Sequence, residues 1–91
     1  MEENGSSDDA SAIEIEASRE FLDSIAEEYA DCVNVGALTE DREQMRKLPP
    51  TPAGALEARA LAKVWLARLE GDPFRVEAAG IDLVSVRQRP S

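Results

Sequence analysis

Carboxylates are the residues of this chain whose types and spacing could do chemistry. Five of them recur every three or four positions, which places them on one face of a helix: Glu16, Glu20, Asp23, Glu27 and Asp31. Arg19 is the only base among them. A solvated face tolerates the weak repulsion within such a row. The alternative is contact with a basic partner protein, and we take these five as candidate partner-binding residues.

Residues for other kinds of chemistry are scarce. The sequence has no histidine, so the most frequent general base and zinc ligand is missing. Cys32 is the only cysteine, and its position in the apolar pattern predicts a buried structural thiol. No EF-hand spacing, phosphate loop or nucleophile elbow occurs. The sequence therefore predicts a protein that is not an enzyme and has no metal site or cofactor.

Size and charge narrow the class further. The 91 residues suffice for one domain, which we place at residues 12–89 after a disordered acidic tail, residues 1–11. The net charge of −9 divides into −12 for residues 1–45 and +3 for residues 46–91. An acidic half repels nucleic acid and attracts basic surfaces. With no secretion signal and no membrane-spanning run, and with arginine favoured over lysine, we expect a cytoplasmic bacterial protein.

The apolar pattern predicts a mainly α fold of the α+β class, two main helices with a short linking helix and a C-terminal β-hairpin. Ser11 followed by Glu14 resembles a capping box, which favours a first helix from about residue 11 to 35 ended by Gly36. Residues 13–16 alternate, so a short strand before a helix at Ser18 stays an alternative.

The later segments have clearer boundaries. Thr39 can cap a short helix at 40–48, and Thr51 with Pro52 begins a long helix that Gly71 and Pro73 end after residue 70. Alternation after Pro73, with a turn at residues 79–80, predicts a hairpin over 74–87. The expected core consists of eleven side chains: Phe21, Leu22, Ile25, Tyr29, Leu61, Trp65, Leu69, Phe74, Val76, Leu83 and Val86.

The helix at 52–70 is apolar on two sides. A wide arc includes Leu61 and Trp65, and a narrower arc opposite it contains four residues: Leu56, Ala60, Val64 and Ala67. The first helix and the hairpin could cover one arc each. Otherwise one arc binds a second chain, and because few elements are available we predict a homodimer through the narrower arc.

These features together predict a small acidic protein-binding module of regulatory type, such as an adaptor, an inhibitor, an antitoxin or an accessory subunit. A different class is a winged-helix DNA-binding regulator, with the helices at 40–48 and 52–70 as its pair and the hairpin as its wing. Its phosphate contacts would come from five bases: Arg59, Lys63, Arg75, Arg87 and Arg89. The acidic net charge opposes that alternative.

Overall fold

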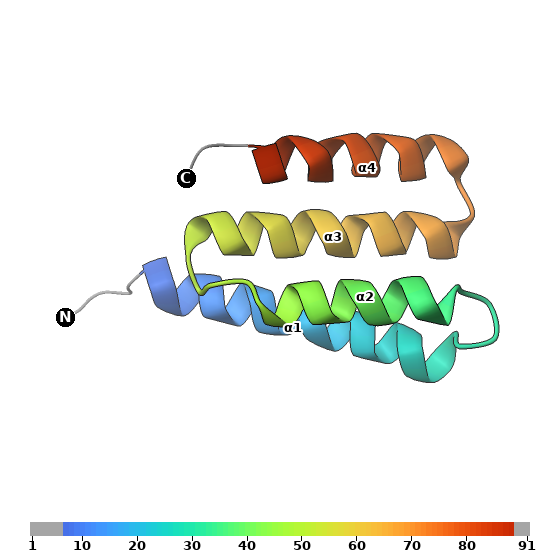
Figure 1. The fold of residues 1–91 in the computed structure, drawn as a ribbon, viewed down its shortest axis with the longest axis horizontal. Coiled ribbons are helices and arrows are strands. Elements are labelled where there is room, and N and C mark those ends of the chain that lie inside the picture. The colour runs from blue at the N-terminus through green and yellow to red at the C-terminus, as the bar shows by residue number, and fades with distance from the viewer. Residues whose placement is uncertain (1–6, 89–91) are drawn as a thin grey trace.

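The computed structural model describes residues 7–88, and the surroundings of side chains from residue 10 onward. It contains four helices: α1 (Ser7–Glu28), α2 (Val35–Arg46), α3 (Pro52–Glu70) and α4 (Pro73–Gln88). Successive helices run in opposite directions, and α3 lies between α4 on one side and α1 with α2 on the other (Figure 1). The helical domain is elongated and flat, with extents of 46 × 27 × 19 Å.

Side-chain caps and prolines set the starts of the last three helices. The Asn34 carboxamide oxygen accepts a hydrogen bond from the Ala37 amide at 3.1 Å, and the Thr51 hydroxyl accepts one from Gly54 at 3.2 Å. The Asp72 carboxylate does the same for α4, accepting from the Phe74 amide at 3.0 Å. Proline occupies the first position of both α3 and α4, where its missing N–H has no helical partner to lose.

The turn between α3 and α4 depends on glycine. Gly71 has φ 72°, the left-handed conformation that ends helices, and its amide donates to the Ala67 and Arg68 carbonyls. This places the Asp72 cap and Pro73 immediately afterwards, so α4 begins at once and folds back along α3.

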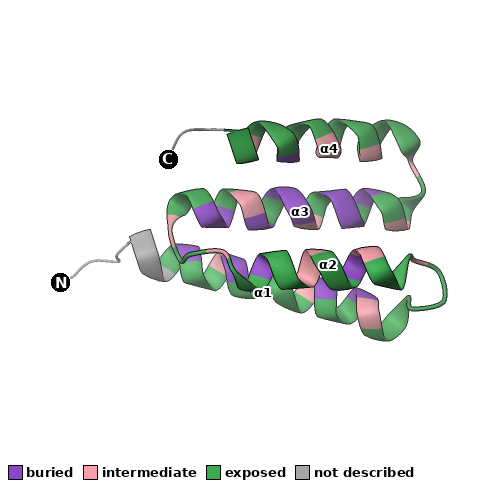
Figure 2. Cartoon of the chain, in the orientation of Figure 1, coloured by how far each residue is buried: buried purple, intermediate pink, exposed green. Residues whose placement is uncertain are grey.

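Helix α3 is buried on both sides, which makes it the centre of the fold. One buried arc, containing Leu61 and Trp65, faces α1 and α2, and the Trp65 indole N–H donates to the Asp41 carboxylate of α2 at 2.7 Å. The opposite arc, with Ala60 and Val64, lies on the side of Glu57, whose carboxylate accepts from Arg87 of α4. Figure 2 shows the resulting burial running along α3.

The predicted β-hairpin is wrong, and with it the α+β class. Residues 74–87 lie within α4, and no strand occurs among residues 7–88. The residues of α4 that face α3 recur with helical spacing: Val76, Ala79, Leu83 and Val86. The Asp72–Pro73 start and this spacing outweigh the alternation of residues 74–78.

The boundaries of the first two helices also need correction. Helix α1 begins at Ser7, so residues 7–11 of the predicted tail are helical, while residues 1–6 lie outside the described part. It ends at Glu28 rather than near residue 35. Gly36 and Thr39 lie inside α2, which Asn34 caps, so neither acts as the predicted stop or cap. The predicted helix at residues 13–16 is confirmed, and the strand alternative is wrong.

The core face of α1 is rotated relative to the prediction. Its buried residues follow spacings of four and three: Ser11, Ile15, Ser18, Leu22 and Ile25. Of the predicted core, Leu22, Ile25, Leu61, Trp65 and Leu83 are buried, and Phe21, Leu69, Val76 and Val86 are partly so. Tyr29 and Phe74 are exposed, which the prediction had wrong.

Candidate functional site

The predicted acidic row divides between three environments. Glu16, Glu20 and Glu27 lie on the side of α1 turned away from the buried face, and all three are exposed. Asp23 lies at the edge next to α2, where its carboxylate pairs with Arg42 at 2.7 Å. Asp31 lies in the turn between α1 and α2. The row is therefore a stripe of three outward carboxylates with two acids beside it.

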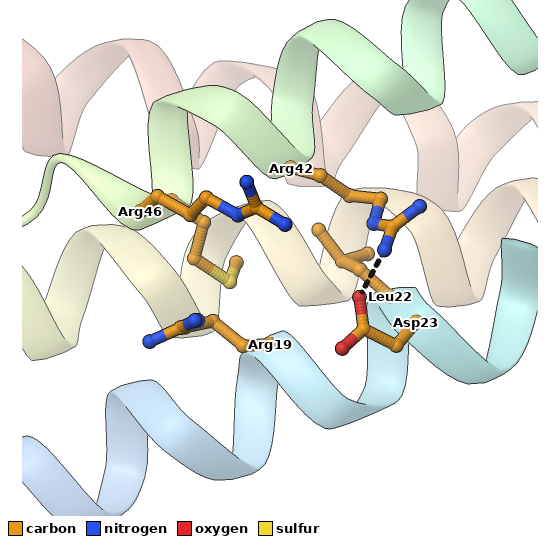
Figure 3. Close-up of a pocket in the computed structure, with 6 residues that line it drawn as sticks. Arg19, Leu22, Asp23, Arg42 and Arg46 are labelled. Carbon is orange, nitrogen blue, oxygen red and sulfur yellow. Dashed lines mark ion pairs between the residues drawn. The ribbon is translucent and has the colours of Figure 1, made fainter.

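Asp23 belongs to a small hollow between α1 and α2 that the sequence reasoning did not identify. Figure 3 shows Arg19 and Asp23 of α1 facing Arg42 and Arg46 of α2. The buried residues Leu22 and Met45 complete the lining of the hollow. Its free volume of about 20 Å³ has room for about one water molecule. The Arg42 Nε is buried without a hydrogen-bond partner and is the group such a water would satisfy.

Three arginines in an acidic protein suggest an anion site, but each one has its own carboxylate. Arg19 lies 3.9 Å from Glu16, Arg42 pairs with Asp23, and Arg46 lies 3.5 Å from Glu43. The hollow is thus close to neutral and too small for a phosphate. The hollow is therefore a polar contact that joins α1 to α2 through the Asp23–Arg42 ion pair.

The outward stripe of α1 also carries an exposed apolar side chain. Ile13 is 70% exposed and lies on the same side as the three carboxylates. Together with Ala12 and Ala17 it borders a shallow hollow on the surface that Glu16 and Glu20 flank. We call Ile13, Glu16, Glu20 and Glu27 the α1 outer face. Ile13 belongs neither to the expected core nor to the predicted partner-binding row, so the sequence did not single it out.

The predicted self-association arc is mostly covered within the chain. Ala60, Val64 and Ala67 are buried on the α4 side of α3, and only Leu56 is exposed. A second chain could reach those three residues only by displacing α4. The prediction that the protein forms a homodimer stays untested, but this arc does not offer a surface for it.

The basic residues of the winged-helix alternative are largely engaged by acids. Arg59 pairs with Glu14 at 2.8 Å, and Arg75 pairs with Glu70 at 3.1 Å. Arg87 binds Glu57, and Arg89 lies outside the described residues. The wing itself is absent, since residues 74–87 are helical. Lys63 is exposed on α3. The fold of residues 7–88 therefore lacks the wing, while the DNA-binding alternative itself stays untested.

Cys32 lies in an environment different from the one that the sequence predicts. The Cys32 thiol is exposed in the turn after α1, so the predicted buried role is wrong. Among residues 7–88, His, Cys, Asp and Glu side chains form no group of three that could hold a metal ion. None of the helices in this range combines the length and apolarity that crossing a membrane requires.

Comparison with known proteins gives no guidance on function. No family model, no curated protein and no solved structure matches the chain.

Proposed function

We propose that this protein is a small non-catalytic binding module, and that its α1 outer face contacts a partner protein with a basic surface. The observation that carries this proposal is the combination of unpaired carboxylates with an exposed isoleucine on one side of one helix. Among the described residues Glu20 and Glu27 form no ion pair, and Glu16 has only its 3.9 Å contact with Arg19.

The composition of this surface indicates what the partner presents. Lysine or arginine side chains match the carboxylates and speed the encounter, because opposite potentials steer association. Ile13 adds an apolar contact of the kind that anchors interfaces once water is excluded from it. A nucleic acid lacks both features, since its phosphates would repel the stripe.

Charge reversal on this face tests the proposal. The Glu20→Lys, Glu27→Lys variant changes two exposed positions and leaves the buried face of α1 intact. Glu40→Lys with Asp82→Lys is a matched control, because it changes the net charge equally at exposed sites on α2 and α4. Exposed substitutions of this kind alter the free energy of unfolding by less than about 0.5 kcal/mol. Affinity capture from the native host, followed by mass spectrometry, compares both variants with the wild type.

We expect the wild type and the control to capture the same basic protein and the Glu20, Glu27 variant to lose it. The capture should also weaken between about 50 and 300 mM salt, as screening of exposed charges increases. Equal capture by all three proteins would contradict the proposal. Equal loss in both variants would show that net charge, rather than this face, determines binding.

A further inference from the structure

Helix α4 packs extensively on one helix only. Figure 1 shows it beside α3, with α1 and α2 on the far side of α3, and no other described helix packs against it to a comparable extent. Of its 16 residues Leu83 alone is buried, and Figure 2 shows most of the remainder exposed. Helix α4 therefore contributes little to the core.

The largest buried side chains lie in the other three helices. Six of them are almost completely shielded from water: Leu22, Ile25, Leu38, Met45, Leu61 and Trp65. Polar contacts join the same helices, because the Trp65 indole donates to Asp41 of α2 at 2.7 Å and an ion pair at 2.7 Å joins α2 to α1. Helices α1, α2 and α3 thus have a core that does not depend on α4.

The contact between α3 and α4 is made mostly of small side chains. Four buried residues form it: Ala60, Val64 and Ala67 of α3 and Leu83 of α4. Small residues let the two helices approach closely, but each removes little apolar surface from water. The two ion pairs between these helices, at 3.1 and 3.2 Å, have partly exposed side chains and so add little stability.

We propose that α4 is a detachable cover, which leaves α3 and unfolds as one unit while α1, α2 and α3 stay folded. A detached α4 would not remain helical. It contains Gly80 and four β-branched residues, which lower its helix propensity, and a single helix of 16 residues is marginal in water. Local openings of this kind cost less free energy than unfolding of the whole domain.

The opening changes which surface the protein presents. In the closed form α4 covers Ala60, Val64 and Ala67, which are part of the arc that the sequence predicts for self-association. In the open form this arc becomes accessible, so the position of α4 controls access to it. The α1 outer face lies on the other side of α3 and is present in both forms, which makes this inference independent of the proposed function.

Native-state hydrogen exchange measured by NMR on the full chain tests the opening. Amides of residues 77–88 should exchange whenever α4 opens, whereas those of residues 58–68 in α3 should exchange only when the whole domain unfolds. After correction for intrinsic rates, we expect residues 77–88 to exchange at least about tenfold faster. Equal rates for the slowest amides of both helices would overturn the proposal. A gradient that rises only towards residue 88, with residues 77–83 as slow as α3, would overturn it too.

A conservative core substitution separates local opening from global unfolding. Ile25 lies in the core that stays folded, so Ile25→Val weakens the closed and the open form equally. It should speed exchange in α1 and α3 by about 2- to 12-fold and leave residues 77–88 unchanged. Leu83→Val is the matched change in the α4 contact, and it should speed exchange in both sets by a similar factor because it weakens only the closed form. Acceleration of residues 77–88 by Ile25→Val equal to that in α3 would show that all four helices unfold together.

Thiol labelling measures the opening without relying on amides. In a Cys32→Ser background, Ala60→Cys lies under α4 and Ala58→Cys lies on the side of Leu61 and Trp65, both at buried positions of the same helix. We expect iodoacetamide to label the Ala60→Cys variant at least about tenfold faster than the Ala58→Cys variant. Adding Gly80→Ala should slow labelling at position 60 by about 2- to 5-fold, since alanine stabilises α4. Equal rates at the two positions, or a rate at position 60 that Gly80→Ala does not change, would overturn the proposal.

Discussion

Gly54 lies in the first turn of α3, where replacing it with alanine should destabilise the protein. A Cβ built on Gly54 would lie 2.1 Å from the Pro49 carbonyl oxygen, a backbone atom that cannot rotate away. The linker or the start of α3 must therefore shift, and overpacking of this kind costs about 1–3 kcal/mol. Alanine recovers about 0.5–1 kcal/mol through its higher helix propensity, so we expect a net loss centred near about 1 kcal/mol and at most about 2.5 kcal/mol.

Gly80 provides the matched control, because the same substitution there should have the opposite sign. It lies inside α4, and a Cβ at this position meets no atom within 4 Å. Gly80→Ala should therefore stabilise the protein by about 0.5–1 kcal/mol. Thermal unfolding followed by circular dichroism measures both variants, with about 4–8 °C expected per kcal/mol for a domain of this size.

The two results would refute different parts of the reasoning. A Gly54→Ala variant as stable as the wild type would mean that the Pro49 linker does not pack against α3 as described. A Gly80→Ala variant that melts at a lower temperature would indicate that residue 80 is not helical, as the hairpin prediction had it.

Two further substitutions test contacts that fix α2 and α3. Trp65→Phe removes the hydrogen bond to the Asp41 carboxylate and should lower the free energy of unfolding by about 1.5–3 kcal/mol. In denaturant titrations the double variant Trp65→Phe, Asp41→Ala should lose less unfolding free energy than the sum of the losses in the two single variants. A loss equal to that sum would contradict the hydrogen bond. Thr51→Ala removes the cap of α3 and should destabilise by about 1 kcal/mol. Thr39→Ala, whose hydroxyl donates only to Val35 of its own helix, should change stability by less than about 0.5 kcal/mol, and a similar loss in both variants would refute the capping role.

Helix α3 was predictable because its boundaries are encoded locally. Thr51 and Pro52 start it, Gly71 ends it, and the structure has the predicted span of residues 52–70. Helix α4 has a similar start in Asp72 and Pro73, but Pro73 was interpreted only as a stop for the preceding helix. Alternation over five residues then favoured a strand, although the residues that pack on α3 follow a helical period across the whole segment.

The orientation of α1 could not be predicted by counting large apolar residues. Ser11 and Ser18 are buried beside Ile15, Leu22 and Ile25, while Ile13 is exposed, so the hydrophobicity of a single residue does not say whether it packs. Small side chains let helices approach closely, whereas a pattern based on hydrophobicity alone assigns buried serines to the exposed side of the helix. For the same reason the sequence located the carboxylate stripe but missed Ile13 beside it.

The pairing of the remaining charges depends on tertiary contacts between segments far apart in the sequence. Asp23 meets Arg42 across α1 and α2, and Arg87 meets Glu57 across α4 and α3. No spacing in a single segment reveals such pairs, so the sequence could not show that Asp23 is engaged while Glu20 and Glu27 form no ion pair among the described residues.

Photo-cross-linking from the α1 outer face tests the proposed function most directly. A benzophenone amino acid placed at Ile13 lies on the exposed stripe, and one placed at Glu40 lies on the exposed side of α2 as a control. On irradiation in the native host, position 13 should form a cross-link to one basic protein, and the added Glu20→Lys, Glu27→Lys changes should abolish it. A cross-link that forms equally from position 40, or that survives the charge reversal, would contradict the claim that the α1 outer face binds the partner.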